Sequence, residues 1–102
     1  MLLRARVKAP RRNEFDGWFE TVHLRDVAAI PGVSKVRTSR NSDGTRLGFY
    51  TFESSDVLQA ALASPQAAYA RGTWGAWQPD LEELFIEMWA AVFHIPMYAG
   101  IN

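Results

Sequence analysis

His23 is the side chain in this sequence best suited to carry out chemistry. It follows Phe19 by four residues, at the edge of an apolar stripe with helical spacing, and so can face a space between a helix and a sheet. An imidazole with a pKa near ~6.5 exchanges protons at neutral pH. Asp26 lies three residues later, where it can orient the imidazole or accept its proton. The alternatives are a structural histidine tied to a backbone carbonyl and, for Asp26, a surface ion pair with Arg25 or Lys35.

Aromatic side chains supply candidate walls for a substrate pocket around His23. They make up 13% of the chain, and the candidates are Trp18, Tyr50, Phe52, Trp74 and Trp77. Trp18 and Phe52 also fit an ordinary core. Trp74 and Trp77 lie in a Gly-containing connection, which favours a lid or a pocket rim. The Tyr50 hydroxyl can act with His23 on a carbonyl or enolate oxygen.

Other kinds of site find little support in the sequence. Without cysteine there is no disulfide, thiol nucleophile or Cys-based metal site. His23 and His94 lack metal-ligand spacing, and no nucleophile elbow, phosphate loop or dinucleotide fingerprint is present. We therefore expect no metal and no cofactor, with haem on His23 as a weaker alternative. Arg37 is a candidate for binding a substrate carboxylate, although a solvated strand face also explains it.

The composition predicts an ordinary globular protein. A length of 102 residues indicates one domain over 1–102, and 48% apolar with 22% charged residues is typical of such domains. The zero net charge argues against a nucleic-acid partner. No apolar run approaches the ~20 residues that span a bilayer, and we see no signal peptide. We expect no membrane association and a cytoplasmic location.

Changes in apolar periodicity predict the elements that position these residues. Residues 2–8 alternate like a strand, and 13–30 read as an amphipathic helix with Asn13 as its N-cap and Pro31-Gly32 as its stop. Residues 33–40 and 47–53 form a hairpin around the turn 41–44. Ser54 or Ser55 starts a second helix, which Pro65 interrupts. Its predicted inner stripe comprises Val57, Leu58, Ala61, Leu62, Ala68 and Tyr69. Residues 72–77 read as irregular, 84–95 as an apolar strand and 96–102 as a tail.

The order strand, helix, strand, strand, helix, strand predicts an α+β fold of the ferredoxin-like βαββαβ type. Its four-stranded antiparallel sheet carries both helices on one face and leaves the other face solvated or covered by a partner. The first and last strands then lie side by side, so that Arg4 and Arg6 can face Glu83 and Glu87. Such pairs explain the basic first strand without invoking nucleic acid.

Two stretches resemble the EthD-like dimeric α/β-barrel proteins. Residues 13–40, with Trp18, His23, Asp26 and Pro31-Gly32-Val33, resemble the motif Asn-x-Trp-x-x-x-x-His-x-x-Asp-x-x-x-x-Pro-Gly-Val. Residues 50–55 resemble the strand-to-helix joint of the same proteins. The resemblance implies a homodimer whose two sheets pack face to face, with a pocket in each subunit between the helices and the sheet.

Members of that family include lactone isomerases, polyketide cyclases, dehydratases, decarboxylases and cofactor-free monooxygenases. The resemblance therefore implies a small cofactor-independent enzyme acting on an aromatic, lactone or polyketide-like molecule. In it, His23 with Asp26 or Tyr50 would remove and return a proton. Two alternatives remain open, namely a cofactor-free monooxygenase and a ligand-binding or dimerisation module without chemistry.

Overall fold

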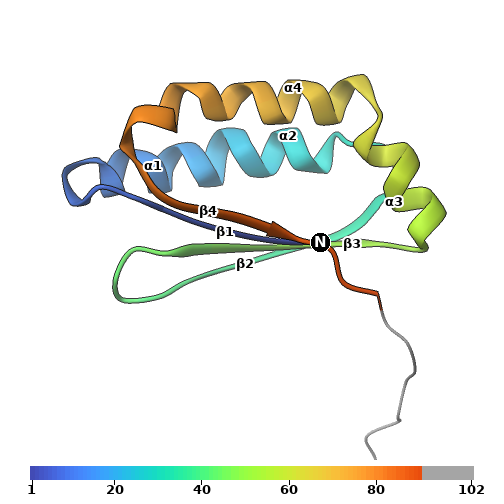
Figure 1. Ribbon diagram of the computed structural model, residues 1–102, viewed down its shortest axis with the longest axis horizontal. Coiled ribbons are helices and arrows are strands. Elements are labelled where there is room, and N and C mark those ends of the chain that lie inside the picture. The colour runs from blue at the N-terminus through green and yellow to red at the C-terminus, as the bar shows by residue number, and fades with distance from the viewer. Residues whose placement is uncertain (91–102) are drawn as a thin grey trace, which may run out of the picture.

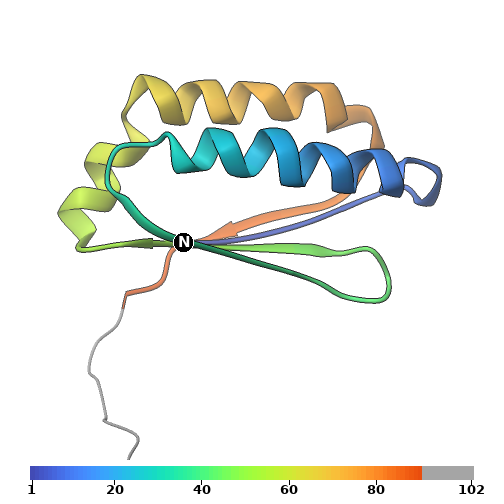
Figure 2. The same ribbon diagram turned by 180° about the vertical axis from the view of Figure 1, so that it is seen from behind.

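Four strands form one antiparallel sheet in the computed structural model, which describes residues 1–90. The strands are β1 (Leu2–Val7), β2 (Val33–Arg40), β3 (Arg46–Phe52) and β4 (Leu81–Glu87), in the order β2-β3-β1-β4. All the helices lie on one face of this sheet (Figures 1 and 2). The predicted α+β, ferredoxin-like βαββαβ arrangement is confirmed.

The first helical segment is continuous over residues 12–28, where the apolar stripe predicted a helix. It comprises α1 (Arg12–Trp18), a π-helical turn (Phe19–His23) and α2 (Leu24–Ala28), after a 3-10 turn at Ala9–Arg11. The predicted Asn13 cap is wrong, because the helix starts at Arg12 as a continuation of the 3-10 turn and has no side-chain cap. The predicted stop is confirmed, since Gly32 has a φ of 95°, a left-handed conformation that favours glycine.

The second helical segment is divided in two at Pro65, as the sequence predicted. It comprises α3 (Ser55–Leu62) and α4 (Pro65–Thr73), and the Ser54 hydroxyl caps α3 by accepting from the Val57 amide at 3.1 Å. The inner stripe is wrong at Ala68 and Tyr69, which are exposed. The helix restarts at Pro65, and the phase of the apolar stripe restarts with it, which buries Ala67 and Ala70 instead.

Two further boundaries differ from the sequence prediction. Residues 72–77 are helical rather than irregular, because α4 continues to Thr73 and a 3-10 helix follows over Trp74–Asp80. The last strand begins at Leu81 rather than residue 84 and ends at Glu87, with residues 88–90 outside any regular element. The predicted strand residues 91–95, with His94 among them, and the predicted tail 96–102 lie outside the described residues.

Ion pairs between β1 and β4 support the observed strand pairing. Glu83 lies opposite Arg6, with 3.4 Å between Oε2 and Nη1, and it also pairs with Arg4. Glu87 instead lies opposite Leu2, and its carboxylate accepts from the indole of Trp89 at 3.1 Å. The predicted role of charge in this pairing is therefore confirmed at Glu83 and wrong at Glu87.

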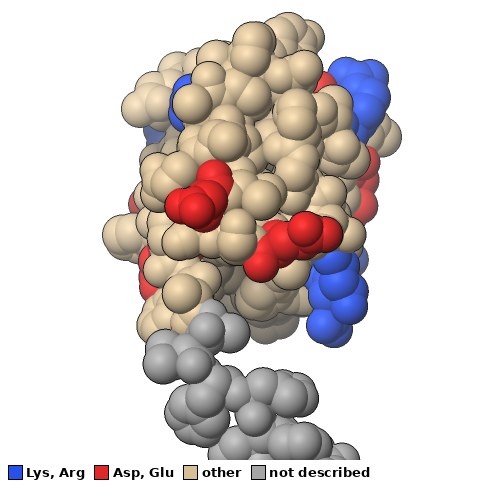
Figure 3. Space-filling model, turned by 90° about the vertical axis from the view of Figure 1, so that its right-hand side faces the viewer, with Lys and Arg blue, Asp and Glu red and all other residues tan. Residues whose placement is uncertain are grey.

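The core fills the space between the sheet and the helices. Its buried members are Leu3, Ala5, Val7, Phe15, Phe19, Val27, Tyr50, Trp74 and Trp77. None of the helices in the described part of the chain lies over the opposite face of the sheet (Figure 1). Within residues 1–90, no helix is long and apolar enough to cross a membrane. The end of the molecule around α3 carries scattered acidic and basic side chains and no continuous basic surface (Figure 3).

Candidate functional site

A buried pair of polar side chains, His23 and Tyr50, joins the first helical segment to the sheet. The imidazole Nε2 lies 2.6 Å from the Tyr50 hydroxyl oxygen, and the two side chains are 2% and 1% exposed. Tyr50 leans along β3 over Gly48, where a Cβ atom would collide with the hydroxyl. Glycine at position 48 therefore lets the hydroxyl reach the imidazole.

Burial keeps both members of this pair uncharged at neutral pH. It lowers the pKa of His23 to about 4 and raises the pKa of Tyr50 above its usual range, against the opposing effect of the Arg46 charge. The imidazole Nδ1 is also buried, and it has no hydrogen-bond partner among the described residues. His23 is therefore a neutral imidazole with one ring nitrogen bonded and the other unpaired.

Aromatic rings enclose the imidazole. The centroids of Trp18, Phe19 and Trp74 lie 5.6, 4.7 and 5.0 Å from that of His23. Trp77 packs one layer further away, against Phe15 and Trp18. Trp74 and Trp77 are 9% and 4% exposed. Trp74 and Trp77 therefore do not lie at a lid or a pocket rim as the sequence suggested, because their 3-10 helix turns both rings into the core.

Asp26 and Arg37 are not brought to the imidazole. Asp26 is 7% exposed, its closest described cation is Arg25 at 3.7 Å, and no hydrogen bond joins it to His23 within residues 1–90. Arg37 lies opposite Phe49 in the ladder, on the sheet face away from the helices. Tyr50, rather than Asp26, therefore orients the imidazole.

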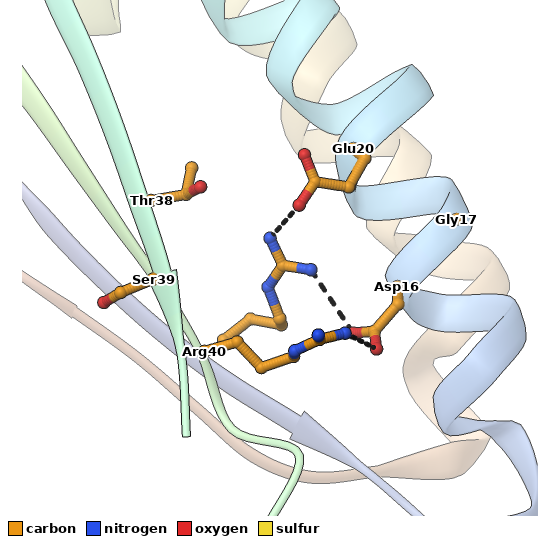
Figure 4. Close-up of a pocket in the computed structure, with 7 residues that line it drawn as sticks. Asp16, Gly17, Glu20, Thr38, Ser39 and Arg40 are labelled. Atoms are coloured by element: carbon orange, nitrogen blue, oxygen red, sulfur yellow. Dashed lines mark hydrogen bonds and ion pairs between the residues drawn. The ribbon is translucent and has the colours of Figure 1, made fainter. Parts of the chain in front are cut away.

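Sequence reasoning missed a charged cluster at one end of the helix–sheet interface (Figure 4). Arg46 is only 3% exposed; its Nη1 lies 3.4 Å from Asp16, and its Nη2 donates to Glu20. Its guanidinium also stacks over Phe19, 4.6 Å from the ring centroid. Two patterns point to this cluster, namely the alternation Arg46–Gly48–Tyr50 on one strand face and the i, i+4 spacing of Asp16 and Glu20.

Two cavities lie at opposite ends of this interface. The first, of about 450 Å³, is lined by Asp16, Gly17, Glu20, Thr38, Ser39, Arg40 and Arg46. The second, of about 620 Å³, lies at the joint between β3 and α3, and Tyr50, Phe52, Leu58 and Trp89 are among its lining residues. The predicted pocket residues Tyr50 and Phe52 thus share a cavity, whereas His23 lines neither. Within residues 1–90, no group of three or more His, Asp or Glu side chains could hold a metal ion.

Several solved structures have a fold similar to that of this chain. A Deinococcus radiodurans protein named for antibiotic biosynthesis monooxygenases matches 97% of this chain and 100% of its own, with a TM-score of 0.70 and 13% identity. An ethyl tert-butyl ether d (EthD) family protein from Bacillus halodurans matches 85% of this chain and 96% of its own, with a TM-score of 0.63 and 16% identity. The chain shares the ferredoxin-like α+β fold of these proteins.

A third similar structure carries a stated activity. A variant of SnoaB, a cofactor-independent oxygenase from Streptomyces nogalater, matches 90% of this chain and 94% of its own, with a TM-score of 0.59 and 18% identity. No protein-family model matches the sequence, and a search of curated proteins finds no match. At these identities the similarity establishes the ferredoxin-like fold and leaves the reaction to be argued from the site.

Proposed function

We propose that this protein is a small cofactor-independent enzyme in which His23 moves a proton on an aromatic, lactone or polyketide-like molecule. The observation that carries the proposal is the buried hydrogen bond between His23 and Tyr50, which leaves Nδ1 without a partner among residues 1–90. A histidine kept only for structure would satisfy both ring nitrogens, because an unpaired buried polar atom costs ~1–3 kcal/mol. The Trp18 and Trp74 rings pack directly against the imidazole, so a flat substrate would reach it from the cavity that Tyr50 lines, by stacking on these rings as they part.

The proposed reaction uses the tautomer that carries its proton on Nε2. Nε2–H then donates to the Tyr50 oxygen, which holds the ring in place, and the Nδ1 lone pair accepts a proton from a carbon acid. The C–H bond breaks, and its electron pair passes to the neighbouring carbonyl oxygen to form an enolate. Burial disfavours the resulting imidazolium, so the proton returns readily to the intermediate. Isomerisation, cyclisation and dehydration all fit this step. A decarboxylation would use only its second half, in which the imidazolium protonates the carbanion that remains when the C–C bond breaks and carbon dioxide leaves.

Replacing His23 tests the proposal directly. Wild-type protein is expected to exchange deuterium from solvent into members of a panel of enolisable aromatic ketones and lactones, followed by NMR. His23→Gln is expected to slow the exchange at least about a hundredfold, and Tyr50→Phe about tenfold, because Tyr50 only positions the base. Tyr69→Phe is the matched control, since Tyr69 is 65% exposed on α4. Exchange that persists in His23→Gln would rule out His23 as the base.

A cofactor-free monooxygenase is the second candidate, and the similarity to a cofactor-independent oxygenase favours it. In that reaction His23 removes a proton from the substrate, and the resulting carbanion reacts with molecular oxygen, which is the oxidant. Oxygen uptake that depends on substrate and on His23 identifies this activity.

A ligand-binding or dimerisation module without chemistry is the remaining alternative. It predicts ligand binding in His23→Gln and no turnover in any variant. For the proposed enzyme we also propose a cytoplasmic location.

The proposed enzyme is a homodimer joined through the sheet face that has no helix over it. Phe49 and Phe85 are 40% and 59% exposed there, beside the half-buried Leu2 and Leu47. Arg4 and Arg37 share this face, but its exposed apolar side chains are of the kind that a partner subunit typically covers. Light scattering is expected to give the mass of two chains for wild type and of one for Phe85→Lys. Tyr69→Lys, which places the same charge on α4, should remain dimeric, and a wild-type monomer would contradict the proposal.

A further inference from the structure

The charged cavity at the Arg46 end of the helix–sheet interface has the chemistry of an anion site. Arg46 is buried, yet it lines this cavity beside the more exposed Arg40. We infer that the cavity takes the carboxylate of a small organic acid on Arg46, and that Glu20 occupies this position until the ligand displaces it. The inference rests on the proposed function, for which it specifies an acidic substrate.

Arg46 is suited to hold such a ligand because it is fixed in place. Its guanidinium lies between Phe19 and two carboxylates, with only 3% of the side chain exposed, so it needs no ordering when a ligand arrives. Its Nε is a buried donor without a partner among the described residues. Arginine binds carboxylates through two parallel N–H bonds, which adds geometric selectivity.

Glu20 is the carboxylate that a ligand can most easily replace. Asp16 is shared, since it accepts from Arg40 at 3.0 Å as well as from Arg46, and 23% of its side chain is exposed. Glu20 pairs only with Arg46 among the described residues, and 52% of its side chain is exposed. Figure 4 shows Glu20 above Asp16 on the same helix, with its carboxylate directed into the cavity. A ligand carboxylate can take over the bonds to the buried guanidinium, while the half-exposed Glu20 carboxylate turns outward into water.

Phe19 connects the anion site to the proposed base. Its ring centroid lies 4.6 Å from the Arg46 guanidinium carbon and 4.7 Å from the His23 ring centroid. The Arg46 charge also acts on the Tyr50 hydroxyl, whose pKa it lowers against the effect of burial. The Arg46 guanidinium and the His23 ring are therefore at most about 9 Å apart, the sum of these two distances. A fitting substrate carries its carboxylate within that distance of the carbon that loses the proton.

The charges of the cluster predict how binding responds to substitution. Asp16 and Glu20 balance Arg40 and Arg46, so an added carboxylate binds against a neutral site unless Glu20 leaves. Removing the Glu20 charge leaves one positive charge unpaired, and both competition and repulsion disappear. Neutral ligands of the same shape should gain nothing from this change.

The experiment titrates benzoate and benzyl alcohol into wild type, Glu20→Gln and Glu14→Gln, following tryptophan fluorescence. Glu14 provides the matched control, because it lies on the same helix, is 69% exposed, and pairs with Arg11 away from the cavity. Benzoate is expected to bind about tenfold more tightly to Glu20→Gln than to wild type, equivalent to about 1.4 kcal/mol. Glu14→Gln should match wild type, and benzyl alcohol should distinguish none of the three.

The anion site is overturned by equal benzoate affinity in wild type and Glu20→Gln, by no benzoate binding at all, or by an equal gain for benzyl alcohol. Binding is measured without turnover, which separates this test from that of the proposed function. Tight benzoate binding together with unaffected deuterium exchange in His23→Gln removes the proposed base and leaves the anion site. Loss of exchange in His23→Gln without any effect of Glu20→Gln removes the anion site alone.

Discussion

Between neutral pH and about pH 4, the protein is expected to lose roughly 3 kcal/mol of its free energy of unfolding through His23 alone. Burial lowers the pKa of His23 from 6.5 to about 4, and each pKa unit is equivalent to ~1.4 kcal/mol. Below pH 6.5 the unfolded chain binds a proton at this residue that the folded chain does not bind until about pH 4. The stabilisation is therefore complete above pH 6.5, falls with pH through this window, and changes no further below about pH 4.

Urea unfolding of wild type and His23→Gln at several pH values measures this effect. The difference in unfolding free energy between the two proteins should shift by roughly 3 kcal/mol across the window, because their other titrating groups are shared. An NMR titration of the His23 ring in wild type gives the same answer without a substitution. Parallel stability curves, or a ring that titrates near pH 6.5, would contradict the buried neutral imidazole.

Local patterns in the sequence account for most of the fold. Strict alternation over residues 2–7 defines β1, and the hydroxyl of Ser54 together with Pro65 sets the start and the break of the second helical segment. These signals act within a few residues of where they stand, so one sequence suffices to interpret them. Boundaries that depend on neighbouring turns were less predictable, as at Asn13, where a preceding 3-10 turn continues directly into the helix.

The candidate site depends on contacts that local patterns do not carry. His23 meets Tyr50 across 27 positions of sequence, and the approach requires Gly48, whose role is visible only once β3 faces the helix. Asp26 is close to His23 in sequence, but no hydrogen bond joins them in the described chain. Arg37 is kept away from His23 for a simpler reason, because strand alternation and its pairing with Phe49 place it on the opposite sheet face.

Arg46 shows what the same patterns could have predicted. It shares a strand face with Gly48 and Tyr50, so the assignment of Tyr50 to a pocket already implied a charged residue beneath the helix. A buried arginine requires carboxylates, and Asp16 and Glu20 stand four residues apart on the helix above. Asp16 and Glu20 stand 30 and 26 positions before Arg46, so only the fold shows that they meet it.

Replacing Trp74 with alanine is expected to destabilise the fold by ~3–5 kcal/mol, the usual effect of removing a large buried aromatic ring. Trp74 is 9% exposed, and its ring centroid lies 4.9 Å from Trp18 and 5.0 Å from His23. For a domain of this size, such a loss lowers the melting temperature by at least ~12 °C. Thermal unfolding at equal protein concentration measures it.

Tyr69→Ala provides the matched control, because Tyr69 lies on α4, which leads directly into the 3-10 helix that holds Trp74. Tyr69 is 65% exposed, so its removal should change stability by no more than ~0.5 kcal/mol. Equal effects of the two substitutions would place Trp74 at a surface, as expected of a lid. If Trp74→Ala does not fold, Trp74→Phe keeps part of the ring and should show a smaller loss of stability.

Trp74→Phe is also expected to change the pKa of His23. Water entering the opened space would raise this pKa from about 4 toward 6.5, so an NMR titration of the imidazole in Trp74→Phe tests whether the Trp74 ring keeps the base neutral.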